Sequence, residues 1–222
     1  MTPEKFVVAN WKQNKTLDEA LIWCKEFATL VSETDLNKVV VIVCPPAVFV
    51  PKLFEVLNPL NVAVGVQDVS PFADGAHTGF VGAGQVERFC KYAIVGHSER
   101  EEPREVVMEK AKRCAESNVI PVICFKSADQ YQTVDGAIYA LEDPSNISVD
   151  GVYRAKSTQE VESLVDTARE FFGQKSGIIY GGSVNVENAQ ELASIKALNG
   201  VLVGNASLSP HEFADIVRKF SL

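Results

Sequence analysis

Eight short, almost continuous apolar runs rich in β-branched residues recur along the chain, and amphipathic segments separate them. The runs are Phe6–Ala9, Val39–Cys44, Val62–Gln67, Tyr92–Gly96, Ile120–Cys124, Ile138–Leu141, Ile178–Tyr180 and Val201–Val203. Strands with one wet face alternate apolar and polar residues, whereas parallel strands covered on both faces are apolar throughout. The runs therefore predict parallel strands covered on both faces.

Three of the separating segments have clear helical signals. The first has apolar residues at helical spacing on one face, namely Leu17, Ala20, Leu21, Cys24, Phe27 and Val31. Ser157 and Glu160 form a capping box, which predicts a helix that runs to Phe172 with a stripe of Val161, Leu164, Val165 and Ala168. Pro210 after Ser209 predicts the start of the last helix, whose apolar residues are Phe213, Ile216, Val217 and Phe220.

About eight β/α units in 222 residues predict an α/β fold, a single (β/α)8 barrel domain over residues 1–222. A doubly wound open sheet is the alternative. No G-x-G-x-x-G follows the first strand, and residues able to do chemistry follow several different strands, as a barrel's catalytic face requires. No linker or composition shift divides the chain.

Charge and cysteine usage exclude several classes of function. Lys and Arg number 21 against 29 Asp and Glu, a net charge of −8, so nucleic acid and anionic membranes are poor partners. No apolar run approaches the roughly 20 residues of a membrane span. The five cysteines are scattered without a C-x-x-C pair, and with three histidines they suggest no metal site. We therefore expect a cytoplasmic protein with reduced thiols and no cofactor.

Three side chains able to do chemistry directly follow predicted strands. Lys12, after the first strand, is placed to hold an anionic substrate, although a lone lysine is more often a surface residue. His97, after the fourth strand, precedes a Ser98 that could cap a short helix, and a nearby helix N-terminus favours a neutral imidazole. Glu142, after the sixth strand, is a candidate general base, with Asp143 as its competitor. A structural histidine and a solvated loop acid are the alternatives.

Two glycine-containing turns follow the seventh and eighth strands. They hold Gly181, Gly182 and Ser183, and Gly204 and Asn205. Loops at these positions form the phosphate site of many barrels, because glycine lets backbone amides approach an anion. Each turn alone is a weak signal, but two in consecutive units predict an anion site.

The segment from Ser70 to Phe80 is too long for a simple connection between a strand and a helix. Loops of this kind cover an active site or project into a partner. His77 within it is more readily explained as an interface or surface residue than as a catalyst.

Taken together, the motifs of this chain resemble those of triosephosphate isomerase, in the order in which that family has them. They are Ala9-Asn10-Trp11-Lys12, Gly75-Ala76-His77-Thr78-Gly79, Val95-Gly96-His97-Ser98-Glu99-Arg100, Glu142, Tyr180-Gly181-Gly182-Ser183 and Val203-Gly204-Asn205-Ala206-Ser207-Leu208. The resemblance runs from about residue 5 to the C-terminus. It implies a barrel enzyme of glycolysis and gluconeogenesis that interconverts dihydroxyacetone phosphate and glyceraldehyde 3-phosphate.

The resemblance also implies a role for individual residues. Glu142 moves the proton between two carbons and neutral His97 acts as the electrophile, a pairing for which this family is the standard example. Lys12 and Asn10 hold the substrate, and Glu99 orients Lys12 or shares in proton transfer. The residues that the resemblance implies for binding the substrate phosphate are Ser183, Gly182, Gly204, Asn205 and Ser148. The resemblance also implies a dimer or tetramer whose interface includes Thr78, His77 and Gly79.

Three features depart from the family pattern. Only 17 residues separate Cys124 from Glu142, so the fifth helix is expected to be short or missing, as in the archaeal branch. The lid region, 143–151, has Pro144 one position late, no Gly-Thr-Gly, and Ser148 where a glycine is expected. A lid that fails to close would release methylglyoxal as a by-product. Asn205 replaces the second glycine of a Gly-Gly pair.

Two other functions remain alternatives to an active isomerase. One is a phosphate-binding barrel with weak or lost isomerase activity that serves as a binding or structural oligomer. The other is a pentose-phosphate epimerase, which would need metal ligands at the strand ends, and the sequence has no histidine pair to provide them.

Overall fold

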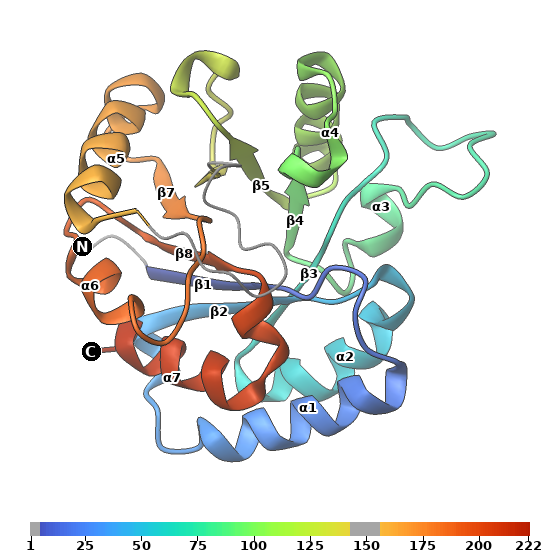
Figure 1. Ribbon diagram of the computed structural model, residues 1–222. Coiled ribbons are helices and arrows are strands. Elements are labelled where there is room, and N and C mark those ends of the chain that lie inside the picture. The colour runs from blue at the N-terminus through green and yellow to red at the C-terminus, as the bar shows by residue number, and fades with distance from the viewer. Residues whose placement is uncertain (1–4, 143–155) are drawn as a thin grey trace.

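The computed structural model describes residues 5–142 and 156–222, and its eight parallel strands close into a barrel (Figure 1). The strands are β1 Lys5–Asn10, β2 Val39–Cys44, β3 Ala63–Val66, β4 Tyr92–Val95, β5 Ile120–Phe125, β6 Ile138–Leu141, β7 Gly177–Tyr180 and β8 Gly200–Val203. Each strand pairs with its neighbours in chain order, and β1 also pairs with β8. The barrel prediction is therefore confirmed, and the open sheet is excluded.

Helices surround the barrel. They are α1 Leu17–Leu30, α2 Val50–Leu57, α3 Ala83–Val86, α4 Arg104–Glu116, α5 Thr158–Phe172, α6 Ala189–Ser194 and α7 Pro210–Phe220. Short 3-10 turns are η1 Leu36–Lys38, η2 Ala47–Phe49, η3 Asn58–Leu60, η4 Ser98–Arg100, η5 Ala128–Gln130 and η7 Asn205–Leu208. The capping box of Ser157 and Glu160 and the cap at Ser209 are both present, so the predicted helix starts are confirmed.

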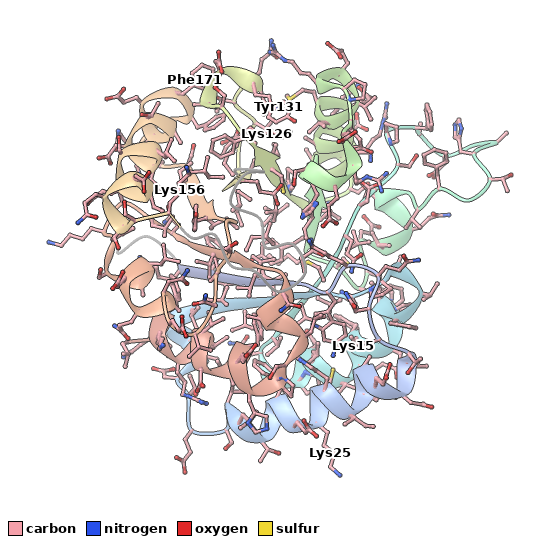
Figure 2. The ribbon with its side chains drawn as sticks, in the orientation of Figure 1. Lys15, Lys25, Lys126, Tyr131, Lys156 and Phe171 are labelled. Atoms are coloured by element: carbon pink, nitrogen blue, oxygen red, sulfur yellow. The ribbon has the colours of Figure 1, made fainter. Side chains whose placement is uncertain are left out.

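The connection between β5 and β6 has no α-helix, as the shortness of this segment predicted. Between β5 and β6 the chain forms only the three-residue turn η5. Tyr131 is buried beside this turn (Figure 2), and the Gln130 side chain donates a hydrogen bond to its hydroxyl at 2.8 Å. The Val134 amide donates to the Tyr139 hydroxyl at 2.6 Å. These contacts hold the shortened connection against the barrel without a helix.

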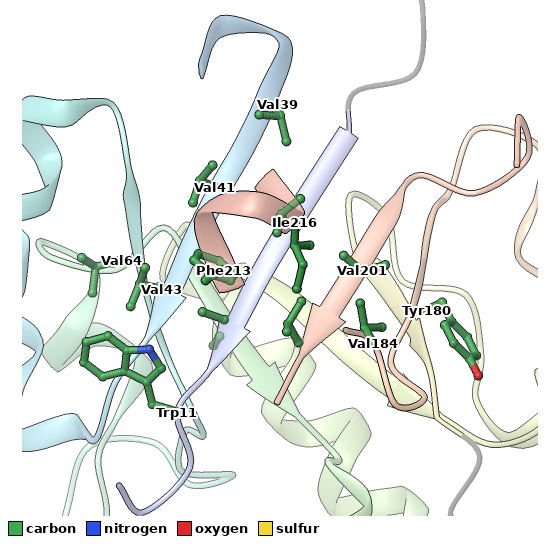
Figure 3. Packing of buried hydrophobic residues seen from close by; sticks show 14 of the residues in the cluster. Trp11, Val39, Val41, Val43, Val64, Tyr180, Val184, Val201, Phe213 and Ile216 are labelled. Atoms are coloured by element: carbon green, nitrogen blue, oxygen red, sulfur yellow. The ribbon is translucent and has the colours of Figure 1, made fainter. Parts of the chain in front are cut away.

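The core has two parts separated by the wall of the barrel. Alternate strand residues, including Phe6, Val8 and Ile42, fill the interior, and the residues between them face the surrounding helices. Figure 3 shows Phe213 and Ile216 of α7 near Val41 of β2 and Val201 of β8, which belong to the same core cluster. This packing places the carboxyl ends of the strands, and the loops that follow them, at one rim.

Two apolar positions of the predicted helix stripes are on the surface instead. Leu17 is 39% exposed and Leu164 is 36% exposed. Leu17 is the first residue of α1, and the first buried residue of this helix is Ala20. Trp23 and Phe27 are the large residues of α1 that are buried; they stack on each other, and Trp23 also packs on Phe213.

A buried ion network joins the start of the segment after β3 to α4. Lys110 of α4 is 1% exposed, and its ammonium lies 2.6 Å from Asp68 Oδ1 and 2.6 Å from Glu102 Oε1. Arg100 also pairs with Asp68 and Glu102, each at 2.9 Å. Burial raises the pKa of the Asp68 carboxyl, and the hydrogen bond from Lys110 acts against that rise. The network ties loops after β3 and β4 to each other below the rim.

None of the helices in the two described ranges has the length and hydropathy of a membrane span. All five cysteines are free and buried. Burial raises the pKa of the Cys24, Cys90 and Cys114 thiols to about 12.

Candidate active site

A cavity of about 250 Å³ opens at the carboxyl ends of the strands. Residues from five strand ends line it: Asn10, Trp11, Lys12, Asn14, His97, Glu142, Gly181, Ser183, Val184, Leu202, Gly204, Asn205 and Leu208. The side chains predicted from the ends of the first, fourth and sixth strands therefore meet in one place. A barrel brings them together because parallel strands present all their carboxyl ends at the same rim.

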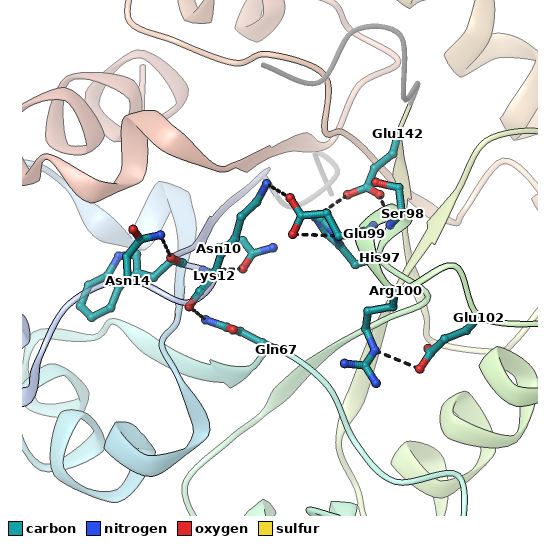
Figure 4. Close-up of polar contacts among 11 residues, drawn as sticks. Asn10, Lys12, Asn14, Gln67, His97, Ser98, Glu99, Arg100, Glu102 and Glu142 are labelled. Carbon is teal, nitrogen blue, oxygen red and sulfur yellow. Dashed lines mark hydrogen bonds and ion pairs between the residues drawn. The ribbon is translucent and has the colours of Figure 1, made fainter. Parts of the chain in front are cut away.

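Lys12 is held at three points. Its backbone is left-handed, with φ +53°, a conformation that a residue with a Cβ rarely adopts. Its amide donates to Asn10 Oδ1 at 3.1 Å, and its carbonyl accepts from Gln67 Nε2 at 2.9 Å. Its ammonium binds the Glu99 carboxylate (Figure 4). Glu99 thus makes the contact with Lys12 that the family resemblance implies.

The hydrogen bonding of His97 fits a neutral imidazole. Its Nδ1 accepts a hydrogen bond from the Glu99 amide at 3.2 Å, so that nitrogen carries no proton. The proton is therefore on Nε2, which lies 3.3 Å from Glu142 Oε1 (Figure 4). The histidine caps η4 with its own side chain, and the prediction that Ser98 caps this turn is wrong.

Glu142 is a buried carboxylate at the end of β6, only 2% exposed. Its Oε2 accepts a hydrogen bond from the Ser98 amide at 3.0 Å, and Oε1 faces His97. The Cys124 thiol lies beside it. Burial raises the pKa of this thiol well above its usual range, and the neighbouring Glu142 carboxylate adds to the shift. A carboxylate held away from water beside an N–H donor can take a proton from a bound carbon acid.

The predicted phosphate residues fall into two groups. Ser183, Gly204 and Asn205 line the cavity, and Ser183 has a left-handed backbone with φ +49°. Asn205 begins η7, so its amide stands at the start of a helical turn despite the loss of the usual glycine. Gly182 does not line the cavity, and Gly181 does. A Cβ on Gly182 would lie 2.4 Å from the Tyr180 hydroxyl, so this glycine makes room for a tyrosine. Ser148 and the lid, 143–151, lie outside the described residues.

The long segment after β3 projects from the barrel in Figure 1. Thr78 and Gly79 line a second cavity, of about 650 Å³, which shares Asn10, Lys12 and His97 with the first. His77 lines neither of these cavities and stacks on Phe72, with ring centroids 4.3 Å apart. His77 is exposed on this segment.

Gln67 is the residue at this rim that sequence reasoning missed. It directly follows β3, and in the sequence it is the last residue of the apolar run Val62–Gln67. Its side chain reaches under Lys12 (Figure 4). A polar residue that ends an apolar strand at the catalytic rim is the signal that could have identified it.

Comparisons with known proteins agree with this geometry. A family model described as triosephosphate isomerase matches residues 5–220. Triosephosphate isomerase of Thermus thermophilus is 31% identical, and the match covers 96% of this chain and 97% of that protein. The Clostridium tetani enzyme is 30% identical, and the match covers 95% of this chain and 94% of that protein. The Aquifex aeolicus enzyme is 28% identical, and the match covers 97% of this chain and 99% of that protein.

Proposed function

Because this chain belongs to the triosephosphate isomerase family and interconverts dihydroxyacetone phosphate and D-glyceraldehyde 3-phosphate, we propose that the reaction occurs in the 250 Å³ cavity. The observation that supports this most is the pairing of a buried Glu142 carboxylate with His97, whose Nε2 lies 3.3 Å from Glu142 Oε1 and whose Nδ1 accepts a backbone hydrogen bond. Carbon acid isomerisation needs a base and a hydrogen-bond donor at neighbouring atoms of one substrate.

We infer that Glu142 removes a proton from the carbon next to the substrate carbonyl. The electron pair of that C–H bond moves to form an enediolate, and His97 Nε2–H donates a hydrogen bond to the oxygen that becomes negative. Nε2 gives its proton to the negative oxygen and takes the proton of the neighbouring hydroxyl. Glu142 returns its proton to the neighbouring carbon, and the carbonyl re-forms at the oxygen that lost its proton. The Ser98 amide, 3.0 Å from Oε2, holds the carboxylate while no substrate is bound.

Lys12 supplies the positive charge of this proposed site. Its ammonium, 30% exposed at the rim, is placed to offset the charges of the phosphate and of the enediolate. Asn10 keeps the Lys12 amide in place and lines the same cavity. Glu99 orients the ammonium through their ion pair.

The substrate phosphate is assigned to the opposite wall of the proposed site. Ser183, Gly204 and Asn205 line it, and backbone amides at such turns bind anions without a further cation. Gly182 supports this wall through the space it leaves for Tyr180. Ser148 remains part of the proposal as a lid residue that contacts the phosphate.

The proposed function is tested by the turnover of D-glyceraldehyde 3-phosphate by the purified chain in a coupled assay. We expect turnover in the ordinary enzyme range, because the base, the electrophile and the ammonium lie together. Nothing in the geometry of residues 5–142 and 156–222 favours a barrel that has lost its activity.

We propose that the projecting segment after β3 is an oligomer interface through His77, Thr78 and Gly79. All three are exposed, and the neighbouring Phe72 and Phe80 are 45% and 51% exposed. A pair of large apolar side chains this exposed on one projecting segment is typical of a contact surface between protein chains. A dimer or a tetramer of this chain is the partner that the family implies.

Light scattering after size exclusion tests the interface. We expect the wild type to have a multiple of the monomer mass, and Thr78→Glu to shift it toward the monomer, because a desolvated, unpaired carboxylate is costly. Thr133→Glu, in another exposed loop, serves as the control and should leave the mass unchanged. A monomeric wild type, or equal masses for Thr78→Glu and wild type, would contradict the proposal.

We also propose a cytoplasmic location. The five free, buried thiols suit a reducing compartment. Cell fractionation with an antibody to the chain checks this, and recovery in an oxidising compartment would contradict it.

A further inference from the structure

We propose that Gln67 is a positioning residue for the reaction, which holds Lys12 in its left-handed conformation and thereby keeps its ammonium at the cavity. The inference rests on the role proposed for Lys12 above. It assigns to the end of β3 a part in the site that the motifs do not reveal, because Gln67 lines the second cavity and not the 250 Å³ cavity.

The Gln67 side-chain amide uses both of its N–H groups at the base of Lys12. Nε2 donates to the Lys12 carbonyl and to the Cys44 carbonyl, each at 2.9 Å. The Cys44 carbonyl also accepts from the Trp11 amide at 3.2 Å. One side chain thus joins the carboxyl ends of β1, β2 and β3.

The backbone of Lys12 needs such support. With φ +53°, its Cβ crowds the backbone, and a residue other than glycine keeps this conformation only when surrounding contacts compensate. Asn10 holds the amide side of the residue and Gln67 holds the carbonyl side. The two bonds together fix both peptide groups that flank the strained residue.

The direction of the Lys12 side chain depends on this backbone. A change of φ to the ordinary negative range would turn the Cα–Cβ bond away from its present direction. The side chain now runs past Gly204, where an added Cβ would lie 3.7 Å from Lys12 Cε, and ends at Glu99. Loss of the Gln67 bonds would therefore displace the ammonium from both the phosphate wall and Glu99.

The role requires a side chain of this reach that donates two hydrogen bonds. Methionine has nearly the same length and no donor, and a glutamate carboxylate would face two carbonyl oxygens as an acceptor. Gln67→Met and Gln67→Glu should therefore both lose the two hydrogen bonds that position Lys12, although each nearly keeps the shape of the side chain.

The test is a double-mutant cycle of Gln67→Met and Lys12→Met, in the full chain, with glycerol 3-phosphate as an inert three-carbon phosphate probe. Kd is measured by calorimetry, and kcat and KM by turnover. We expect Gln67→Met alone to weaken Kd about fivefold or more and to lower kcat/KM at least tenfold. In the Lys12→Met background, Gln67→Met should change Kd less than about twofold, because the group it positions is gone.

Gln130→Met is the matched control, since Gln130 is also a partly buried glutamine after a strand, and it binds Tyr131 instead. It should leave Kd unchanged. An equal loss of affinity in both Lys12 backgrounds, or no loss in either, would overturn the inference about Gln67. An unchanged Kd in Lys12→Met alone would instead overturn the role proposed for Lys12, and the inference with it.

Discussion

Glu142→Asp is expected to lower kcat about 100-fold or more while KM changes less than about threefold. The substitution keeps the carboxylate and withdraws it by one methylene. Glu142 is buried with its Oε2 held by the Ser98 amide and its Oε1 facing His97, so the shorter side chain cannot keep both contacts. A base displaced by about 1 Å loses its reach to the substrate carbon, whereas phosphate binding on the other wall is untouched.

Steady-state kinetics of the variant check this result. Glu105→Asp, on the exposed first turn of α4, is the matched control and should behave as the wild type. A kcat equal to that of the wild type would remove Glu142 from the mechanism. A large rise of KM at constant kcat would show that it binds the substrate instead of reacting with it.

Lys110→Met is expected to lower the free energy of unfolding by about 3 kcal/mol, the largest effect on stability that we predict. The ammonium is 1% exposed and pairs with both Asp68 and Glu102, so its removal leaves two carboxylates short of a partner in a poorly solvated place. Arg100 keeps its contacts with both acids at 2.9 Å, which places the loss at the lower end of the range for broken buried ion pairs.

Thermal or urea unfolding measures the loss, and the expected fall in Tm is roughly 6–12 °C for a chain of this size. Lys112→Met is the control on the same helix. Lys112 is 58% exposed and pairs with Glu109 and Glu116 on the surface, so its removal should change stability by less than about 0.5 kcal/mol. An equal loss of unfolding free energy in the two variants would contradict the prediction that the buried ion pairs of Lys110 stabilise the fold.

The strands and the helix starts could be predicted because their signals are local. An apolar β-branched run such as Val39–Cys44 needs no distant partner to be recognised, and it became β2 with the same bounds. The capping box of Ser157 and Glu160 likewise depends on residues three positions apart. The missing fifth helix followed from the length of the chain between β5 and β6.

The rest of the site depended on contacts between distant segments. The two hydrogen bonds of Gln67 span 55 and 23 residues, and the Lys110–Asp68 bond spans 42. Lys110 belongs to no motif, and the only local sign of Gln67 is a polar residue at the end of an apolar run. Helical spacing placed Leu17 and Leu164 on apolar stripes, but only packing decides how far a stripe is covered, and both are partly exposed. The space that Gly182 leaves for the Tyr180 ring was likewise hidden from the sequence.

One measurement tests the central claim most directly, that Glu142 and neutral His97 isomerise a triose phosphate in this cavity. Turnover of D-glyceraldehyde 3-phosphate by the wild type is followed in a coupled assay, and methylglyoxal is measured in the same tube. The account predicts turnover of about 1–10³ s⁻¹ or above, with methylglyoxal as a minor product. Binding of glycerol 3-phosphate without any turnover of glyceraldehyde 3-phosphate would contradict it.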